Sequence, residues 1–153
     1  MNKRMDRKRR NRFRYQGFGF PVILVDVPMV RVRGAWTPDV NYNRLSSRLL
    51  EVLARKPARL TGNEIRFIRH SLEMTLAQFA TRFGITHPAV IKWEKTGNRP
   101  TMMTWALEKD IRLEILRSGS VVNPAGFLAA YGALKEELAA TSESVRLPIG
   151  RSA

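Results

Sequence analysis

The stretch that decides the fold is TLAQFATRFGITHPAVIKWEKTGNRP, residues 75–100. Thr75 and Thr86 each precede a run with apolar residues at helical spacing, so both threonines are predicted N-caps. Gly84 lies between the runs and suits the left-handed position that ends a helix. Two short helices joined by a tight corner are therefore predicted. Their inward-facing residues should be Leu76, Phe79, Ala80 and Phe83 in the first helix, and Val90 and Trp93 in the second.

The second predicted helix should project from the surface. Two helices that cross steeply need a small residue at their contact and a glycine at the corner, and Ala80 and Gly84 occupy these positions. The N-terminus of the second helix then offers free backbone N–H groups and the positive end of its dipole to a phosphate. This pattern resembles the helix-turn-helix of the Xre/Cro/C1 repressor family. Glu94 is expected to pair with Arg66 or Arg69 and so to lock the helices together.

The resemblance implies a site that binds double-stranded DNA. In the family, the exposed N-terminal positions of the second helix touch base edges, which correspond here to Thr86, His87, Pro88, Ala89 and Lys92. Lys92 can donate to guanine O6 and N7, whereas Pro88 and Ala89 can only contact a thymine methyl group. Many relatives carry a glutamine where this chain has Leu76, so Thr75 or Gln78 would have to replace that contact. The predicted phosphate-contacting residues are Thr75, Gln78, Arg82, Lys95, Asn98 and Arg99.

The remaining segments predict a mainly α fold, with a lambda-repressor-like helical domain and a small β-containing N-terminal extension. Apolar runs at residues 20–25 and 29–33 predict two short strands, with one bent edge strand or a pairing through a bulge as the alternatives. Helical spacing recurs at residues 44–55, 63–72, 103–116 and 127–138. The predicted organisation is a disordered basic arm (1–16), a β-containing segment (17–43), the helix-turn-helix domain with its linker helix (44–118), a C-terminal amphipathic helix (119–140) and a disordered tail (141–153).

Composition points to a polyanionic partner. The 153 residues include 27 Lys and Arg against 13 Asp and Glu, a net charge of +14. The excess is concentrated in residues 1–14 and 44–100, and a phosphate backbone is its natural counter-charge. The chain has no cysteine, which excludes disulfides, thiolate zinc sites and cysteine nucleophiles. No catalytic constellation stands out, so we expect no enzymatic activity, cofactor or metal, and no membrane insertion.

A second resemblance covers more of the chain. The segment VPMV at residues 27–30, a linking helix, and LTGNEIRFIR at residues 60–69 are together similar to the two-part antitoxins of type II toxin–antitoxin operons. The resemblance implies a homodimer that represses its own operon in the bacterial cytoplasm and binds a toxin protein through a separate surface. Those relatives hold zinc with cysteine pairs in the N-terminal part, and these cysteines are absent here.

Two other functions remain open at this point. The non-polar Pro88 and Ala89 on the reading face favour a protein-interaction or scaffold module that has kept the helix-turn-helix fold without reading DNA sequence. The basic arm favours a general nucleic-acid-binding protein. A sequence-specific repressor would protect one discrete inverted repeat, whereas a packaging protein would coat any DNA.

Overall fold

The computed structural model describes residues 5–118, 129, 132 and 144–150. These residues form two compact units, one from residues 1–48 together with 144–153 and the other from residues 49–143. Helix α1 (Tyr42–Ala54) runs from the first unit into the second. The prediction of a mainly α fold with a small β-containing extension is wrong. The described residues form five helices and a four-stranded mixed sheet, 44% helix and 25% strand, which is an α/β fold.

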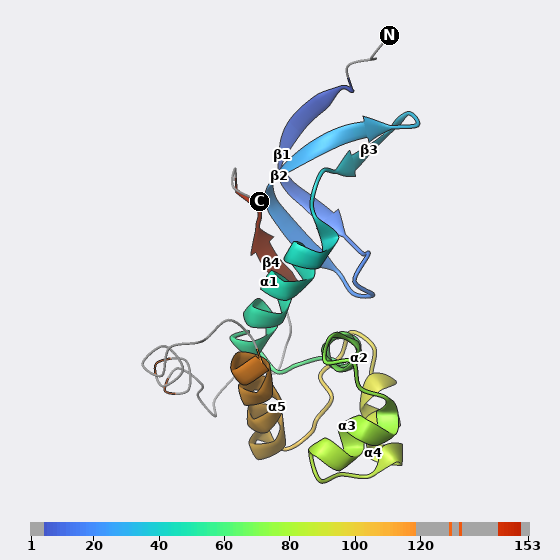
Figure 1. Cartoon of the computed structure of the whole chain (residues 1–153), viewed down its shortest axis with the longest axis vertical. Helices are drawn as coiled ribbons and strands as arrows, with labels where there is room; N and C mark the ends of the chain where they lie inside the picture. Colours follow the sequence, from blue (N-terminus) through green and yellow to red (C-terminus); the bar gives the residue numbers. More distant parts are fainter. Residues whose placement is uncertain (1–4, 119–128, 130–131, 133–143, 151–153) are drawn as a thin grey trace. The chain divides into compact units, whose positions relative to one another are not determined.

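The sheet of the first unit is built around one long strand. Strand β2 (Val22–Val32) pairs antiparallel with β1 (Arg7–Tyr15) along its length, antiparallel with β3 (Ala35–Pro38), and parallel with β4 (Val145–Pro148). Figure 1 shows β1 and β2 as the two long arrows of this sheet. β3 and β4 pair with opposite ends of β2, so β1 forms one whole edge of the sheet.

Strand β2 joins the two predicted strands into one. Asp26, with φ of 53°, interrupts its regular conformation. Before Asp26 the fully buried residues are the even-numbered Val22 and Leu24. After it they are the odd-numbered Val27 and Met29. The bent-strand alternative is therefore the one found, although the strand is central and not at an edge. A two-residue turn at Arg33 and Gly34, both with positive φ, joins β2 to β3, as is typical of tight hairpins.

Two segments predicted to be disordered contain strands. Residues 7–15, within the predicted basic arm, form β1, because an edge strand can pair its backbone while its charged side chains stay in water. Residues 145–148, within the predicted disordered tail, form β4, whose Val145 and Leu147 are buried against β2. The predicted helix at 127–138 lies almost wholly outside the described residues.

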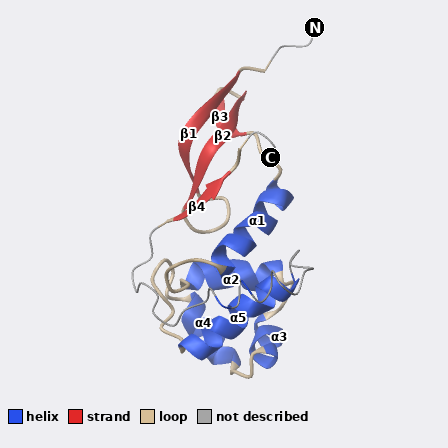
Figure 2. Cartoon of the chain, turned by 90° about the vertical axis from the view of Figure 1, so that its left-hand side faces the viewer, coloured by secondary structure: helices blue, strands red, loops and turns tan. Residues whose placement is uncertain are grey.

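The second unit is a cluster of short helices, drawn in blue in Figure 2. After the end of α1 come α2 (Gly62–Ser71), α3 (Leu76–Arg82), α4 (His87–Glu94) and α5 (Trp105–Ser118). These confirm the helices predicted from the spacing of apolar residues, with ends shifted by a few residues. Their core is fully or almost fully buried, and its largest members include Leu53, Leu60, Ile65, Ile68, Phe79, Val90, Ile111 and Leu116.

A fully buried arginine holds the connection between α1 and α2. The Arg112 guanidinium donates to the carbonyl oxygens of Ala54, Lys56 and Ala58 at 3.3, 2.6 and 2.6 Å, which satisfies acceptors that the end of α1 and the following loop would otherwise leave open. It also donates to Glu108 at 2.9 Å. Burial lowers the pKa of the Arg112 guanidinium from its ordinary value, and the adjacent Glu108 carboxylate opposes this shift.

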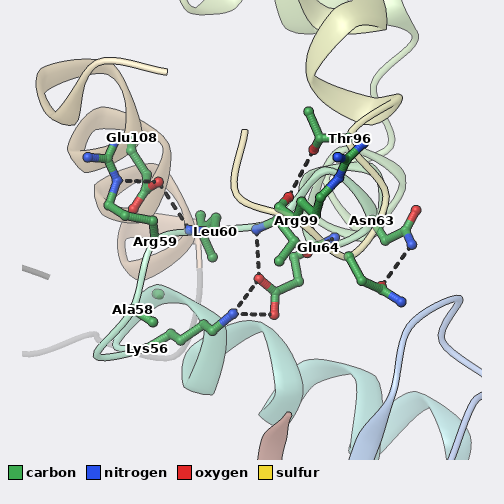
Figure 3. A network of polar contacts seen from close by, with 12 residues as sticks. Lys56, Ala58, Arg59, Leu60, Asn63, Glu64, Thr96, Arg99 and Glu108 are labelled. Atoms are coloured by element: carbon green, nitrogen blue, oxygen red, sulfur yellow. Dashed lines mark hydrogen bonds and ion pairs between the residues drawn. The ribbon is translucent and has the colours of Figure 1, made fainter. Parts of the chain in front are cut away.

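The other oxygen of Glu108 holds the same loop from the opposite side. It accepts hydrogen bonds from Arg59 Nε at 3.0 Å and from the backbone N–H of Leu60 at 3.1 Å (Figure 3). The loop that enters α2 is therefore fixed by two charged side chains of α5 at full burial.

Replacing Arg112 with methionine should be strongly destabilising. The substitution leaves three carbonyl groups without their donor and weakens the charge compensation of Glu108, so we expect a loss of about 3–5 kcal/mol in the free energy of unfolding. The matched control is Arg117→Met on the same helix, whose exposed guanidinium should contribute far less to stability. Urea unfolding measures both variants. Equal losses would contradict the role given to Arg112.

Candidate nucleic-acid interface

The corner between α3 and α4 is formed by backbone hydrogen bonds around one glycine. Gly84 has φ of 66°, its N–H donates to Thr81 O at 3.3 Å, and the N–H of Ile85 donates to Ala80 O at 2.9 Å. This is the Schellman arrangement, in which a left-handed residue ends a helix and satisfies its last carbonyls. The predicted helix end at Gly84 is confirmed.

Both predicted threonine caps are present. The Thr75 hydroxyl accepts from Gln78 N at 3.1 Å while Gln78 Oε1 accepts from Thr75 N at 2.9 Å, a complete capping box. The Thr86 hydroxyl accepts from Ala89 N at 3.3 Å, and Pro88 lies within the first turn of α4. A proline is tolerated there because its missing N–H would have no intrahelical acceptor.

A buried ion pair fixes α4 against α2. Arg69 Nε lies 2.7 Å from Glu94 Oε1, and a second nitrogen of the same guanidinium donates to Met74 O at 3.1 Å, in the loop before α3. Arg66 lies farther from Glu94, at 3.9 Å, and is about half exposed. The predicted pairing of Glu94 is confirmed, with Arg69 as the main partner. One side chain of α2 thus contacts α4 and the loop that leads into α3.

The start of α2 lies directly against the end of α4. A side chain at Gly62 would collide with the carbonyl oxygen of Trp93, so only glycine fits there. The N–H of Asn63 donates to Gly97 O at 2.9 Å, and Asn63 Nδ2 donates to Asn98 Oδ1 at 2.9 Å. Figure 3 shows this contact region, with Thr96 and Arg99 of the post-α4 segment next to Asn63 and Glu64. The segment after α4 is therefore held in place by α2.

Four of the five residues predicted to contact bases lie at the start of α4, and the fifth, Lys92, lies in its last turn. Thr86, His87, Pro88 and Lys92 are exposed, and Ala89 is partly exposed. On the inward side, Val90 and Ala80 are buried. Trp93, predicted to belong to the core, is only partly buried. The start of α4 presents one imidazole to solvent, and the single cation, Lys92, lies in the last turn. Pro88 has no N–H, and the N–H of Ala89 already donates to Thr86.

The residues predicted to contact phosphate differ in how freely they can do so. Lys95 and Arg99 are exposed, and no ion pair engages them within the part of the chain that the structure describes. Thr75, Gln78 and Asn98 are exposed but already make the hydrogen bonds described above. Arg82 is paired with Glu114 of α5.

The partner of Arg82 was not predicted from the sequence. Glu114 is buried and also accepts from Arg117 at 2.8 Å. The pKa of the Glu114 carboxyl is lowered by the hydrogen bond from Arg117 and by the contact with Arg82, against the opposing effect of burial. The spacing of Glu114 and Arg117 is visible in the sequence, whereas nothing local connects Glu114 to Arg82, which lies 32 residues away. A phosphate would have to compete with Glu114 for Arg82.

The described residues contain neither a metal-binding cluster nor a membrane-spanning helix. Across residues 5–118 and 144–150, no three histidine, aspartate or glutamate side chains come together in a way that could hold a metal ion. None of the described helices combines the length and apolar character needed to cross a bilayer.

Comparison of the chain with protein-family models, with curated proteins and with solved structures gives no match.

Two substitutions should have opposite effects on stability through the same backbone conformation. Gly84 and Glu73 both occupy left-handed positions after a helix, with φ of 66° and 56°. A side chain costs about 1 kcal/mol in that region, so we expect Gly84→Ala to lower the free energy of unfolding by roughly this amount and Glu73→Gly to raise it by a similar amount. Thermal and urea unfolding measure both. A stabilising Gly84→Ala would contradict the assigned corner.

The Glu114 cluster should make stability depend on acid pH. Because its folded-state pKa is lowered, the carboxylate stabilises the fold fully above its unfolded pKa of about 4.3 and loses this effect as the pH falls through the folded value. We therefore expect wild type to be more stable than Glu114→Gln at neutral pH and the difference to shrink below pH about 4. Urea unfolding across this range tests it. A difference that stays constant with pH would contradict the ionised pairing.

Proposed function

We propose that the chain is a sequence-specific double-stranded DNA-binding regulator in which α4 is the recognition helix. The observation that carries the proposal is the geometry of α4. Its inward side is buried and tied to α2 by the Arg69–Glu94 pair, while Thr86, His87 and Pro88 at its start and Lys92 in its last turn remain exposed. An exposed helix face that carries a lysine and an imidazole suits a phosphate-lined major groove.

The residues divide into two roles. Lys92, His87 and Thr86 have polar side chains that can donate to base edges, and Pro88 and Ala89 restrict the remaining readout to thymine methyl contacts. Lys95 and Arg99 lie beyond the helix end and position the protein through the phosphate backbone. Thr75 and Gln78 offer weaker contacts, since each already holds the cap of α3.

We further propose that the protein acts as a homodimer, in the manner of an antitoxin-like autorepressor in the bacterial cytoplasm. One recognition helix covers only a few base pairs, and two half-sites about 34 Å apart multiply specificity. The resemblance to two-part antitoxins motivates a toxin protein as a second partner. The sheet unit, which is separate from the α3–α4 region in the fold, is the candidate surface for that partner.

A scaffold function is the alternative that a specific observation favours. Pro88 is exposed and Ala89 partly exposed, so two of the five proposed base-contacting positions carry no hydrogen-bonding side chain. Under this alternative the α3–α4 surface binds a protein, and duplex DNA binds without sequence preference.

Selection of bound duplexes from a random library separates these functions. We expect an enriched inverted repeat, which would also support the homodimer. Lys92→Ala should then reduce the discrimination between the selected and random duplexes by about 1–3 kcal/mol, because one base contact is lost. Arg99→Ala, the matched control, should weaken both duplexes alike. Failure to enrich any sequence, or equal losses for both variants on both duplexes, would overturn the proposal.

A further inference from the structure

The cations of the sheet unit fall into two groups according to their partners. The acidic residues at positions 5–48 and 144–150 are Asp6, Asp26 and Asp39. Each is paired with an arginine at an odd-numbered position, in the pairs Arg7–Asp39 at 3.2 Å, Arg9–Asp26 at 2.9 Å and Arg31–Asp6 at 3.9 Å. Arg9 also donates to the backbone oxygens of Asp26 and Gly150. These arginines are therefore balanced within the sheet.

The even-numbered cations of β1 form no ion pair with an acidic residue of the described chain. We call Lys8, Arg10, Arg12 and Arg14 the even row. All four are exposed. Lys8 and Arg10 are alternate positions on one side of the strand, as are Arg12 and Arg14, and the β1–β2 pairing is interrupted between the two pairs, at Asn11. Successive charges lie roughly 6.7 Å apart and the row extends over about 20 Å.

Strand pairing holds the even row in place. β1 is in register with β2 from Arg7 opposite Val30 to Tyr15 opposite Val22. The Lys8 ammonium also lies 4.1 Å from the centre of the Trp36 ring, on β3. A row of like charges on a fixed backbone repels itself, and this repulsion is relieved when a polyanion displaces the surrounding small ions.

Protection of the sheet edge is the simpler explanation for charge on β1, but it explains less. An edge strand is shielded from unwanted pairing by charged side chains, especially lysine. Here three of the four residues of the even row are arginine, whose planar guanidinium donates two parallel hydrogen bonds to a phosphate. The type of these cations therefore indicates a phosphate ligand.

We propose that the even row is a second DNA contact, which binds the phosphate backbone of a duplex without reading its sequence. This inference rests on the proposed function for the identity of the ligand. A duplex is favoured over a single strand because the aromatic residues of β1 are already engaged. The Arg10 guanidinium lies 5.5 Å from the centre of the Phe13 ring, and Tyr15 packs edge-on against Phe18 with ring centres 5.2 Å apart. Neither ring is free to stack on an unpaired base, which single-strand binding requires.

The test compares two triple variants of equal charge in the full chain. R10Q/R12Q/R14Q removes three cations of the even row, and R7Q/R9Q/R31Q removes the three balanced arginines of the same sheet. Affinity for a random-sequence duplex is measured as a function of salt, so that α4 specificity does not enter. We expect the even-row variant to lower the log–log salt slope by about 2–3, since each phosphate contact contributes roughly 0.9, and the control to lower it by less than about 1.

The outcomes are distinct. Equal log–log salt slopes for the two variants would overturn the inference. It would also be overturned if the even-row variant kept its affinity for duplex DNA but lost affinity for single-stranded DNA or for anionic lipid vesicles. Circular dichroism and thermal unfolding check that each variant folds. If a triple variant unfolds, R12Q and R14Q are measured singly, each with an expected slope change of roughly 0.9.

Failure here is separable from failure of the proposed function. If selection yields no enriched duplex while the even-row slope still falls, the α4 assignment fails and the phosphate contact stands. If an inverted repeat is enriched and Lys92→Ala relaxes its recognition while the even-row slope is unchanged, the second contact fails alone.

Discussion

The orientation of α4 depends on one buried guanidinium. Arg69 contacts Glu94 at the end of α4 and the Met74 carbonyl before α3, so a single side chain of α2 fixes both helices of the corner. Removal of either charge would leave the other buried and uncompensated, which is far more costly than breaking a surface pair. Gly62 adds the second constraint, because only a residue without a side chain lets α2 begin against the Trp93 carbonyl. The exposed face of α4 follows from these two contacts.

The corner could be predicted from the sequence because its determinants are local. The caps at Thr75 and Thr86 and the left-handed Gly84 each act within a few residues, and the structure contains all three. The pairing of Glu94 was also predictable, since helical spacing places it on the side that faces α2. The same reasoning gave no sign of Glu114 as the partner of Arg82, because that contact depends on how α5 packs.

The sheet was largely missed for a different physical reason. A dense run of like charge indicates disorder because its side chains cannot be buried in a core. In an edge strand, however, the side chains can stay exposed while the backbone is paired. β1 therefore forms through backbone pairing with β2, which the charge pattern does not reveal. β4 was missed because it pairs with a segment more than one hundred residues earlier, and its four residues are too few to show a clear period. Long-range pairing of this kind has no local signature.

Net charge is a poor guide to where this chain can bind a polyanion, because many of its cations are used internally. Arg69 and Arg112 are buried in ion pairs, and Arg82 is held by Glu114. The cations that remain exposed and outside ion pairs in the described residues include Lys92, Lys95 and Arg99 near α4 and the even row on β1. Each acidic residue that pairs with an arginine makes that arginine less available to a phosphate. The positions of the acidic residues therefore decide which cations a polyanion can reach. The positive charge available to a polyanion is set by which cations the fold leaves without an acidic partner.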